Sequence, residues 1–360
     1  MVKEKASRIA TYITDLRDIN LNTVVEFSIK KPLDEEQSEI VEQNFEFDSI
    51  EVNAFSDLIS LDELNLSAST ISKLNIGAFN YIQNLKILNL SSNKLQEFDP
   101  DVFQGLKFLE VLDLYSNQIT KIEKNQFCHL VSLKYLNLGC NKINSIDENG
   151  FQSLKNLEHL DLSQNLLMVI KDGTFRDLSK LKNLVLSNNE LNVLDKGSFK
   201  GLSQLVEFNL NNNKLIKLEP GLFDPLSSLI ILYIKYNKIE SISANVFRIN
   251  HLEILDLSSN ELLDLDANAF IHLKKLKYLN LSRNKLNLLD KDLFKPLNLD
   301  VLLMNNNLIS QLQIGTFDNF TQLKVMYLNE NKIDHLDKRL FQNLKELKQL
   351  NISKTFFIYS

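Results

Sequence analysis

The chain has 360 residues, 44% of them hydrophobic and 24% charged, and these proportions are ordinary for a folded protein. Its 46 acidic and 40 basic residues give a net charge of −6, which disfavours nucleic acid as a partner, because nucleic-acid binders need a basic face to displace counterions from phosphates. No apolar run approaches the roughly 18 residues of a membrane helix, so we expect no membrane segment in this chain.

Residues 1–20 form the first distinct segment. They carry charges along their length and lack the apolar core of a secretory signal. Ile9, Ile13 and Leu16 fall at helical spacing, which predicts a short amphipathic helix. A tail without regular structure is the alternative.

Residues 21–60 are predicted to cap the segment that follows. Val25, Phe27 and Ile29 occupy alternate positions, as expected for a first β-strand. The stretch after this strand resembles a degenerate repeat that ends near Phe55.

Residues 61–355 repeat the string LxxLxLxxN every 24 residues, shortened twice to 23, with a phenylalanine ten residues after each asparagine. Ser69 and Thr355 occupy the asparagine position at the two ends. The asparagine column consists of Asn93, Asn117, Asn141, Asn165, Asn189, Asn213, Asn237, Asn260, Asn284, Asn307 and Asn331. The phenylalanine column consists of Phe55, Phe79, Phe103, Phe127, Phe151, Phe175, Phe199, Phe223, Phe247, Phe270, Phe294, Phe317 and Phe341.

Each column has a physical reason. The leucines of each unit point inward from a short strand, and stacked units supply one another with core contacts and ladder hydrogen bonds. The asparagine amide offers donors and an acceptor to backbone groups where the strand ends, so the column predicts an internal ladder. The phenylalanines predict an apolar spine. We expect thirteen parallel strands between Leu61 and Thr355.

Residues 356–360 are mostly apolar, at the place where a polar cap is expected. We therefore predict that the repeat is incomplete at this end. An uncovered apolar end favours association, and homodimerisation stays open.

The unit from Leu109 to Leu130 resembles the typical 24-residue class of leucine-rich repeat, found in Toll-like receptor ectodomains, small leucine-rich proteoglycans and insect extracellular immune and adhesion proteins. The resemblance implies an α/β solenoid, a right-handed horseshoe with a concave parallel β-sheet and an irregular or short-helical convex side. It also implies an extracellular protein or the ectodomain of a membrane protein. Neither end carries the capping cysteines usual in that family, so a cytoplasmic protein is the alternative.

No constellation of residues predicts catalysis, a cofactor or a metal. The five histidines fall in different units without metal-ligand spacing, and Cys128 and Cys140 are expected to point to different surfaces. Because a catalytic site should break the repeat pattern and none is found, we predict that the protein is not an enzyme.

The concave face is the expected binding surface. Seven residues before each asparagine, charges alternate from Lys86 to Lys182, which predicts ion pairs between adjacent strands and no long-range attraction of a charged partner. Four residues before, most positions are Asn or Asp, with aromatic or aliphatic exceptions. Exposed aromatic side chains are typical of binding surfaces. The predicted partner-binding residues are Tyr115, Tyr233, Lys235, Tyr236, Arg283, Leu303 and Tyr327.

Five sequons for N-glycosylation occur, a number that composition alone explains. Their acceptors are Asn65, Asn89, Asn280, Asn319 and Asn351. Asn319 is expected on the convex arc and is the most accessible of them.

Two functions follow from the sequence. The first is a recognition scaffold that binds a protein or microbial ligand on its concave face, extracellular and of the innate-immune or cell-adhesion type. The second is an intracellular adaptor or regulatory subunit of the same fold.

Overall fold

The computed structural model describes residues 40–41 and 48–355, all within the second of two compact units, residues 1–38 and 39–360. The predicted helix or tail at 1–20, the strand at 23–29 and the apolar end at 356–360 lie outside the described residues. The second unit is described here by itself.

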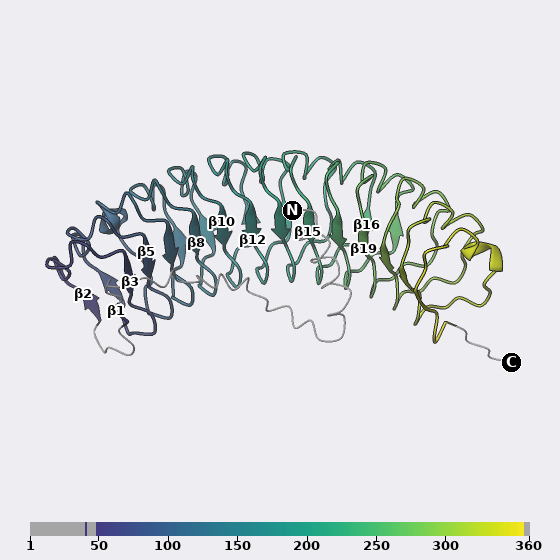
Figure 1. Ribbon diagram of the computed structural model, residues 1–360, viewed down its shortest axis with the longest axis horizontal. Helices are drawn as coiled ribbons and strands as arrows, with labels where there is room; N and C mark the ends of the chain where they lie inside the picture. Colours follow the sequence, from purple (N-terminus) through teal and green to yellow (C-terminus); the bar gives the residue numbers. More distant parts are fainter. Residues whose placement is uncertain (1–39, 42–47, 356–360) are drawn as a thin grey trace. The chain divides into compact units, whose positions relative to one another are not determined.

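The described residues build one parallel sheet whose strands follow chain order, and this confirms the predicted solenoid (Figure 1). Each strand pairs in register with the strand one turn on, so Leu160 lies between Leu136 and Leu184. The strands are β1 Ile40–Val41, β3 Glu63–Asn65, β5 Ile87–Asn89, β6 Val111–Asp113, β8 Tyr135–Asn137, β10 His159–Asp161, β12 Asn183–Val185, β14 Glu207–Asn209, β15 Ile231–Tyr233, β17 Ile254–Asp256, β19 Tyr278–Asn280, β20 Val301–Leu303, β21 Val325–Tyr327 and β22 Gln349–Asn351.

The return of each turn is mostly irregular. Within the described part of the chain it contains no α-helix, so the predicted short-helical component is limited to two 3-10 helices, η1 Pro100–Phe103 and η2 Lys338–Phe341. Eight two-residue strands pair in four small parallel sheets. They are β2 Ser49–Ile50, β4 Lys73–Leu74, β7 Lys121–Ile122, β9 Ser145–Ile146, β11 Val169–Ile170, β13 Val193–Leu194, β16 Ser241–Ile242 and β18 Asp264–Leu265.

The phenylalanine column forms a buried spine. Its members from Phe79 to Phe317 are at most 1% exposed, and most neighbours stack with ring centroids about 6 Å apart, as in the pair Phe127–Phe151 at 6.2 Å. Between Phe103 and Phe127 an additional ring, Phe98, interrupts the stack and meets Phe103 edge to face at 5.3 Å. The spine is therefore locally rearranged beside η1.

The asparagine column joins consecutive turns by hydrogen bonds. Asn165 Nδ2 donates to the carbonyl oxygens of Leu138 at 2.9 Å, Leu162 at 3.1 Å and Ser163 at 3.0 Å, and its Oδ1 accepts from Ile143 N–H at 2.9 Å. One side chain thus satisfies backbone groups of two turns that are closed to water. At the C-terminal end of the column, where Thr355 replaces asparagine, its Oγ1 donates one hydrogen bond, to Ile352 O at 2.6 Å.

The residue before each ladder position has left-handed backbone, with φ between 52° and 57°, and none of these residues is glycine. Such a conformation is uncommon for residues with a Cβ. It recurs because the N–H of this residue donates to the next turn, as Tyr236 does to Ser258 O at 3.1 Å and Arg283 to Asn305 O at 2.9 Å. The repeat therefore fixes the place of a surface row that includes Tyr236 and Arg283.

Candidate binding face

The sheet presents the first and third residue of its three-residue strands on its outer face, and the middle residue is buried in all of them except the last, β22, where Leu350 is 40% exposed. In β8, Tyr135 and Asn137 are half-buried whereas Leu136 is fully buried. The face therefore carries two main rows, which lie six and four residues before the ladder position. A third row, seven residues before it, lies just ahead of the strands.

The charged row forms ion pairs between neighbouring turns. Lys134 Nζ lies 2.8 Å from Glu110 Oε2, and Lys182 Nζ lies 2.6 Å from Glu158 Oε2. Lys86 pairs with Asp62 at 3.3 Å in the same way. The row neutralises its own charge, and this part of the face has little excess charge with which to attract an ionic ligand.

The row four residues before the ladder forms turns. Its Asn and Asp side chains accept a hydrogen bond from the N–H two residues on, for example Asn137 Oδ1 from Gly139 N–H at 3.0 Å and Asp256 Oδ1 from Ser258 N–H at 2.8 Å. Asn and Asp are favoured in such turns because their short side chains reach their own backbone. The preference for Asn and Asp at these positions is visible in the sequence, but this structural role was not predicted from it.

Tyr233 interrupts the polar row without loss of the hydrogen bond. The N–H of Lys235, which an Asn or Asp at position 233 would receive, donates instead to Asn211 Oδ1 of the preceding turn at 2.7 Å. Asn211 is buried, so this acceptor is shielded from water. An aromatic residue can therefore stand on the face while the turn keeps its backbone geometry.

Next to it, Tyr236 is 43% exposed, and Lys235 Nζ lies over its ring at 4.6 Å from the centroid. Arg283 is also exposed and occupies the same left-handed position two turns on. Three of the predicted partner-binding residues are thus accessible in this part of the sheet.

The remaining predicted partner-binding residues differ. Leu303 is only 4% exposed, so its prediction as an accessible contact is wrong: its side chain lies beside the longer Tyr327 in register and is closed to solvent. Tyr327 is half-buried and its hydroxyl donates to Gln349 Oε1 at 3.1 Å. Tyr115 is half-buried. Its pKa is raised mainly by burial and to a smaller extent by the nearby Cys140.

An apolar row crosses the same strands. Ile231, Ile254, Tyr278, Val301 and Val325 lie opposite one another on β15, β17, β19, β20 and β21. This row was not predicted from the sequence. The register of the sheet, which joins residues 23 or 24 apart, is the signal that would have revealed the whole row.

On β8 and β10 this row carries the ionisable residues Tyr135 and His159, whereas β5 and β6 carry Ile87 and Val111. Burial, with smaller contributions from Asp113 and Asp161, raises the pKa of Tyr135 to about 12, and its ring lies 6.2 Å from that of His159. Burial also lowers the pKa of His159 and raises those of Asp113 and Asp161. Each of these shifts favours the uncharged form of the group relative to the same group in water.

The sequons fall into two classes. Asn319 is exposed on the returning arc. The other four lie on the sheet face, where the asparagine oxygen accepts from the N–H of the sequon serine, as in Ser91 N–H to Asn89 at 2.9 Å. Asn280 is 8% exposed and bonds both Ser282 and Asp256, so a glycan there is incompatible with this packing.

One cluster of potential metal ligands was missed by the sequence analysis. Asp101, Cys128 and His129 place one ligand atom each within 4.8 Å of one another, the only such group of three in the described residues. Cys128 and Cys140 are both free thiols. Burial and the charge of Asp101 raise the pKa of Cys128, which disfavours the thiolate that a catalytic nucleophile needs.

Comparison with known protein families identifies the family to which the repeat belongs. The leucine rich repeat model matches eight segments, most of them overlapping, between residue 40 and residue 355. The chain belongs to the leucine-rich repeat family. Its members are interaction scaffolds, and this leucine-rich-repeat chain is a protein-interaction scaffold. None of the curated proteins matches it. No helix in the described residues combines the length and apolar character that crossing a bilayer requires.

Solved structures support the same assignment. TLR13 in a complex with ssRNA13 has 29% identity and a TM-score of 0.71, over 85% of this chain and 48% of that chain. A leucine-rich-repeat protein of Leptospira interrogans has 29% identity and a TM-score of 0.71, over 84% and 75%. The Toll–Spatzle complex of Drosophila, at 24% identity and a TM-score of 0.67 over 78% and 42%, shares the fold. The chain spans less than half the length of the matched TLR13 and Toll–Spatzle chains.

Proposed function

We propose that this leucine-rich-repeat chain is a non-enzymatic recognition scaffold that binds a protein ligand on the sheet face around β15. The observation that carries the proposal is the exchange of hydrogen-bond acceptors at Tyr233, where Asn211 of the preceding turn receives the Lys235 N–H. This exchange keeps the turn intact while Tyr233 and the exposed Tyr236 stand on the face. Tyrosine is enriched among the residues that dominate protein interfaces.

The charge distribution supports a protein over a nucleic acid. The lysines on the face before β14 pair with acidic residues of neighbouring turns, as in Lys134–Glu110 and Lys182–Glu158. Neutralised lysines release few counterions from phosphates. The similar Toll–Spatzle structure is a complex, and so is TLR13 with ssRNA13. RNA is therefore tested as an alternative ligand. A microbial protein is one kind of the protein ligand that we propose.

A photo-reactive amino acid at position 236 tests the proposal, with the same substitution at Tyr81 as the matched control. Tyr81 is 49% exposed and lies on the returning arc. A protein that crosslinks from position 236 and not from position 81 is then purified for affinity measurements. We expect the double variant Tyr233→Ala/Tyr236→Ala to weaken its binding by at least about 30-fold, since one such residue alone contributes about 2 kcal/mol.

Unchanged affinity of a folded double variant rejects this part of the face as the binding site. Crosslinking to RNA, or crosslinking that is equal at both positions, rejects the protein ligand. The variant Tyr81→Ala should bind like the wild type.

The setting we propose is extracellular, as a secreted protein or part of an ectodomain, because the fold resembles TLR13 at 29% identity over most of this chain. Protease treatment of intact cells that express the full-length gene product tests this. Digestion of the repeat supports the proposal, whereas complete protection supports the intracellular adaptor.

A further inference from the structure

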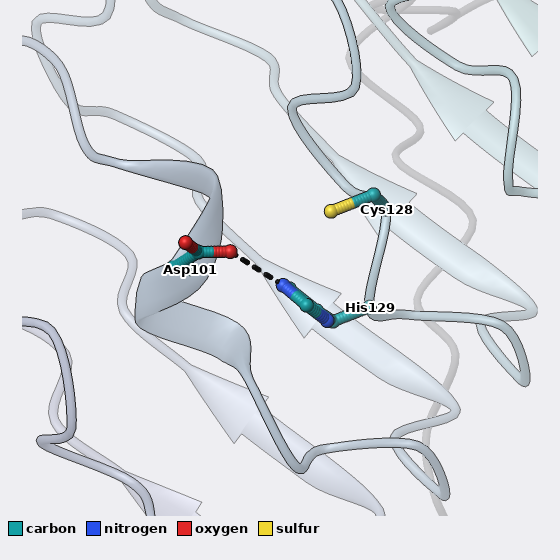
Figure 2. A group of neighbouring side chains, drawn as sticks. All are labelled: Asp101, Cys128 and His129. Atoms are coloured by element: carbon teal, nitrogen blue, oxygen red, sulfur yellow. Dashed lines mark hydrogen bonds and ion pairs between the residues drawn. The ribbon is translucent and has the colours of Figure 1, made fainter.

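Asp101, Cys128 and His129 lie on two consecutive turns and point toward one another (Figure 2). Cys128 and His129 follow Phe127 on one return, and Asp101 belongs to η1 on the preceding return. His129 Nε2 lies 2.7 Å from Asp101 Oδ1. We infer that these three side chains form a binding site for a zinc-class divalent cation on the return side of the repeat, away from the proposed protein-binding face.

Local sequence explains why the carboxylate is there. Pro100 occupies the first helical position of η1, and Asp99 Oδ1 caps the helix by accepting from Asp101 N–H at 2.9 Å. Most other turns have Asn or Gly with left-handed backbone at the place of Asp101, as in Asn125 and Gly221. The 3-10 turn replaces that conformation and directs the carboxylate toward the next return.

A second histidine shows what the repeat needs without a cation. His272 occupies the position of His129 in a later turn, and its Nε2 lies 3.1 Å from Asn245 Oδ1. There the neighbouring residue is Ile271 in place of Cys128. A neutral amide and no thiol are thus sufficient for the contact between turns. The carboxylate and the thiol at the first site are additional, and each is a good zinc ligand.

The donor set suits zinc and its chemical relatives. Cysteine sulfur, histidine nitrogen and carboxylate oxygen are the three common zinc donors, and three protein ligands leave a fourth position for water. On binding, Cys128 releases its proton to solvent, and its thiolate with the Asp101 carboxylate supplies two negative charges to balance the dication. The side chains of Asp101 and His129 are 59% and 29% exposed, so an ion can enter from solvent. Binding replaces the Asp101–His129 contact with two bonds to the metal.

Cobalt is the probe, because a bond between Co²⁺ and thiolate gives a charge-transfer absorption. The untagged full chain, kept reduced with a phosphine, is titrated with Co²⁺ and then with Zn²⁺. We expect one equivalent of Co²⁺ to produce this absorption and Zn²⁺ to abolish it. Removal of outer-shell groups already lowers metal affinity about 10- to 100-fold. We therefore expect Cys128→Ser to lose the absorption and to weaken Zn²⁺ binding by about 100-fold or more.

Matched variants separate the site from the fold. Asp101→Asn recreates the amide–histidine pair of Asn245 and His272, so it should fold normally and still bind Zn²⁺ at least about 10-fold more weakly. Cys140→Ser and His272→Ala should bind like the wild type. The inference is overturned if the wild type shows no thiolate absorption, if Cys128→Ser retains it, or if Asp101→Asn binds Zn²⁺ as tightly as the wild type.

Discussion

The buried asparagine ladder and the polar row four residues before it use related side chains for different purposes. Each ladder amide bonds two turns, as Asn165 does with Leu138 and Leu162, whereas most side chains of the polar row bond only their own turn, as Asn137 does with Gly139. From Asn93 to Asn331 the ladder has no exception, while the polar row has four, at Val185, Tyr233, Leu303 and Tyr327. Residues that serve two turns are fixed, and residues that serve one are free to change.

Replacing one member of each row by alanine tests this difference. Asn165→Ala removes four hydrogen bonds at a buried site and leaves the Ile143 N–H without an acceptor, although the carbonyls of Leu138, Leu162 and Ser163 each keep one other donor. We expect it to lower the free energy of unfolding by about 3 kcal/mol or more. Asn137→Ala removes one bond at the surface and should cost about 1 kcal/mol. Urea unfolding followed by circular dichroism measures both. Equal losses would contradict the distinction between the rows.

Burial of the charged members of the polar row predicts that the stability of the fold depends on pH. Loss of water contact raises the pKa of Asp256 above its ordinary value of 3.8, against smaller opposing hydrogen bonds from Ser258. The folded chain then holds the proton more tightly than the unfolded chain, so Asp256 reduces stability as pH rises from 3.8 through the raised pKa. Asp256→Asn keeps the acceptor and should therefore unfold at a higher temperature than wild type at neutral pH.

The advantage of Asp256→Asn should shrink as the pH is lowered through the raised pKa and vanish below 3.8, where the aspartate becomes protonated in both states. Thermal unfolding of both proteins across this range checks the sign. The matched control is Asp224→Asn on the returning arc, which removes a carboxylate paired with Arg248 and should not gain stability at neutral pH.

The smallest effect is expected in the charged row. Lys182→Gln removes the pair with Glu158 on an exposed strand surface, where such pairs contribute about 0.2–1 kcal/mol and are screened by salt. We expect a loss within that range, reduced further in high salt. Measurement of the unfolding free energy at low and high ionic strength tests it, and a loss as large as that of Asn165→Ala would contradict it.

Much of the fold follows from the sequence because the interior obeys one period. Thirteen strands lie between Leu61 and Thr355, and the Phe and Asn columns are buried along most of their length, since each unit supplies the same contacts to the next. A residue type that is required at every turn is visible in a single chain.

The surface was harder to predict because its contacts depart from that period. Asp101 and His129 meet across adjacent returns although they are 28 residues apart, a separation that does not match the 24-residue period. The bond from Lys235 N–H to Asn211 joins two turns where other turns use their own residue. The burial of Leu303 likewise depends on its neighbours in register. A search for chemically matched residues on adjacent returns would have found the first of these.

Two turns are one residue shorter than the rest, yet the ladder bonds persist across them: Asn260 Nδ2 reaches Ile234 O at 2.9 Å and Asn307 Nδ2 reaches Leu281 O at 2.9 Å. The missing residue must therefore be absorbed on the return, outside the segment from strand to ladder. Each turn contacts only its immediate neighbours, so whole turns could be duplicated or deleted during evolution. Short insertions could likewise be accepted on the return, because the length of each strand and its distance from the ladder position stay the same.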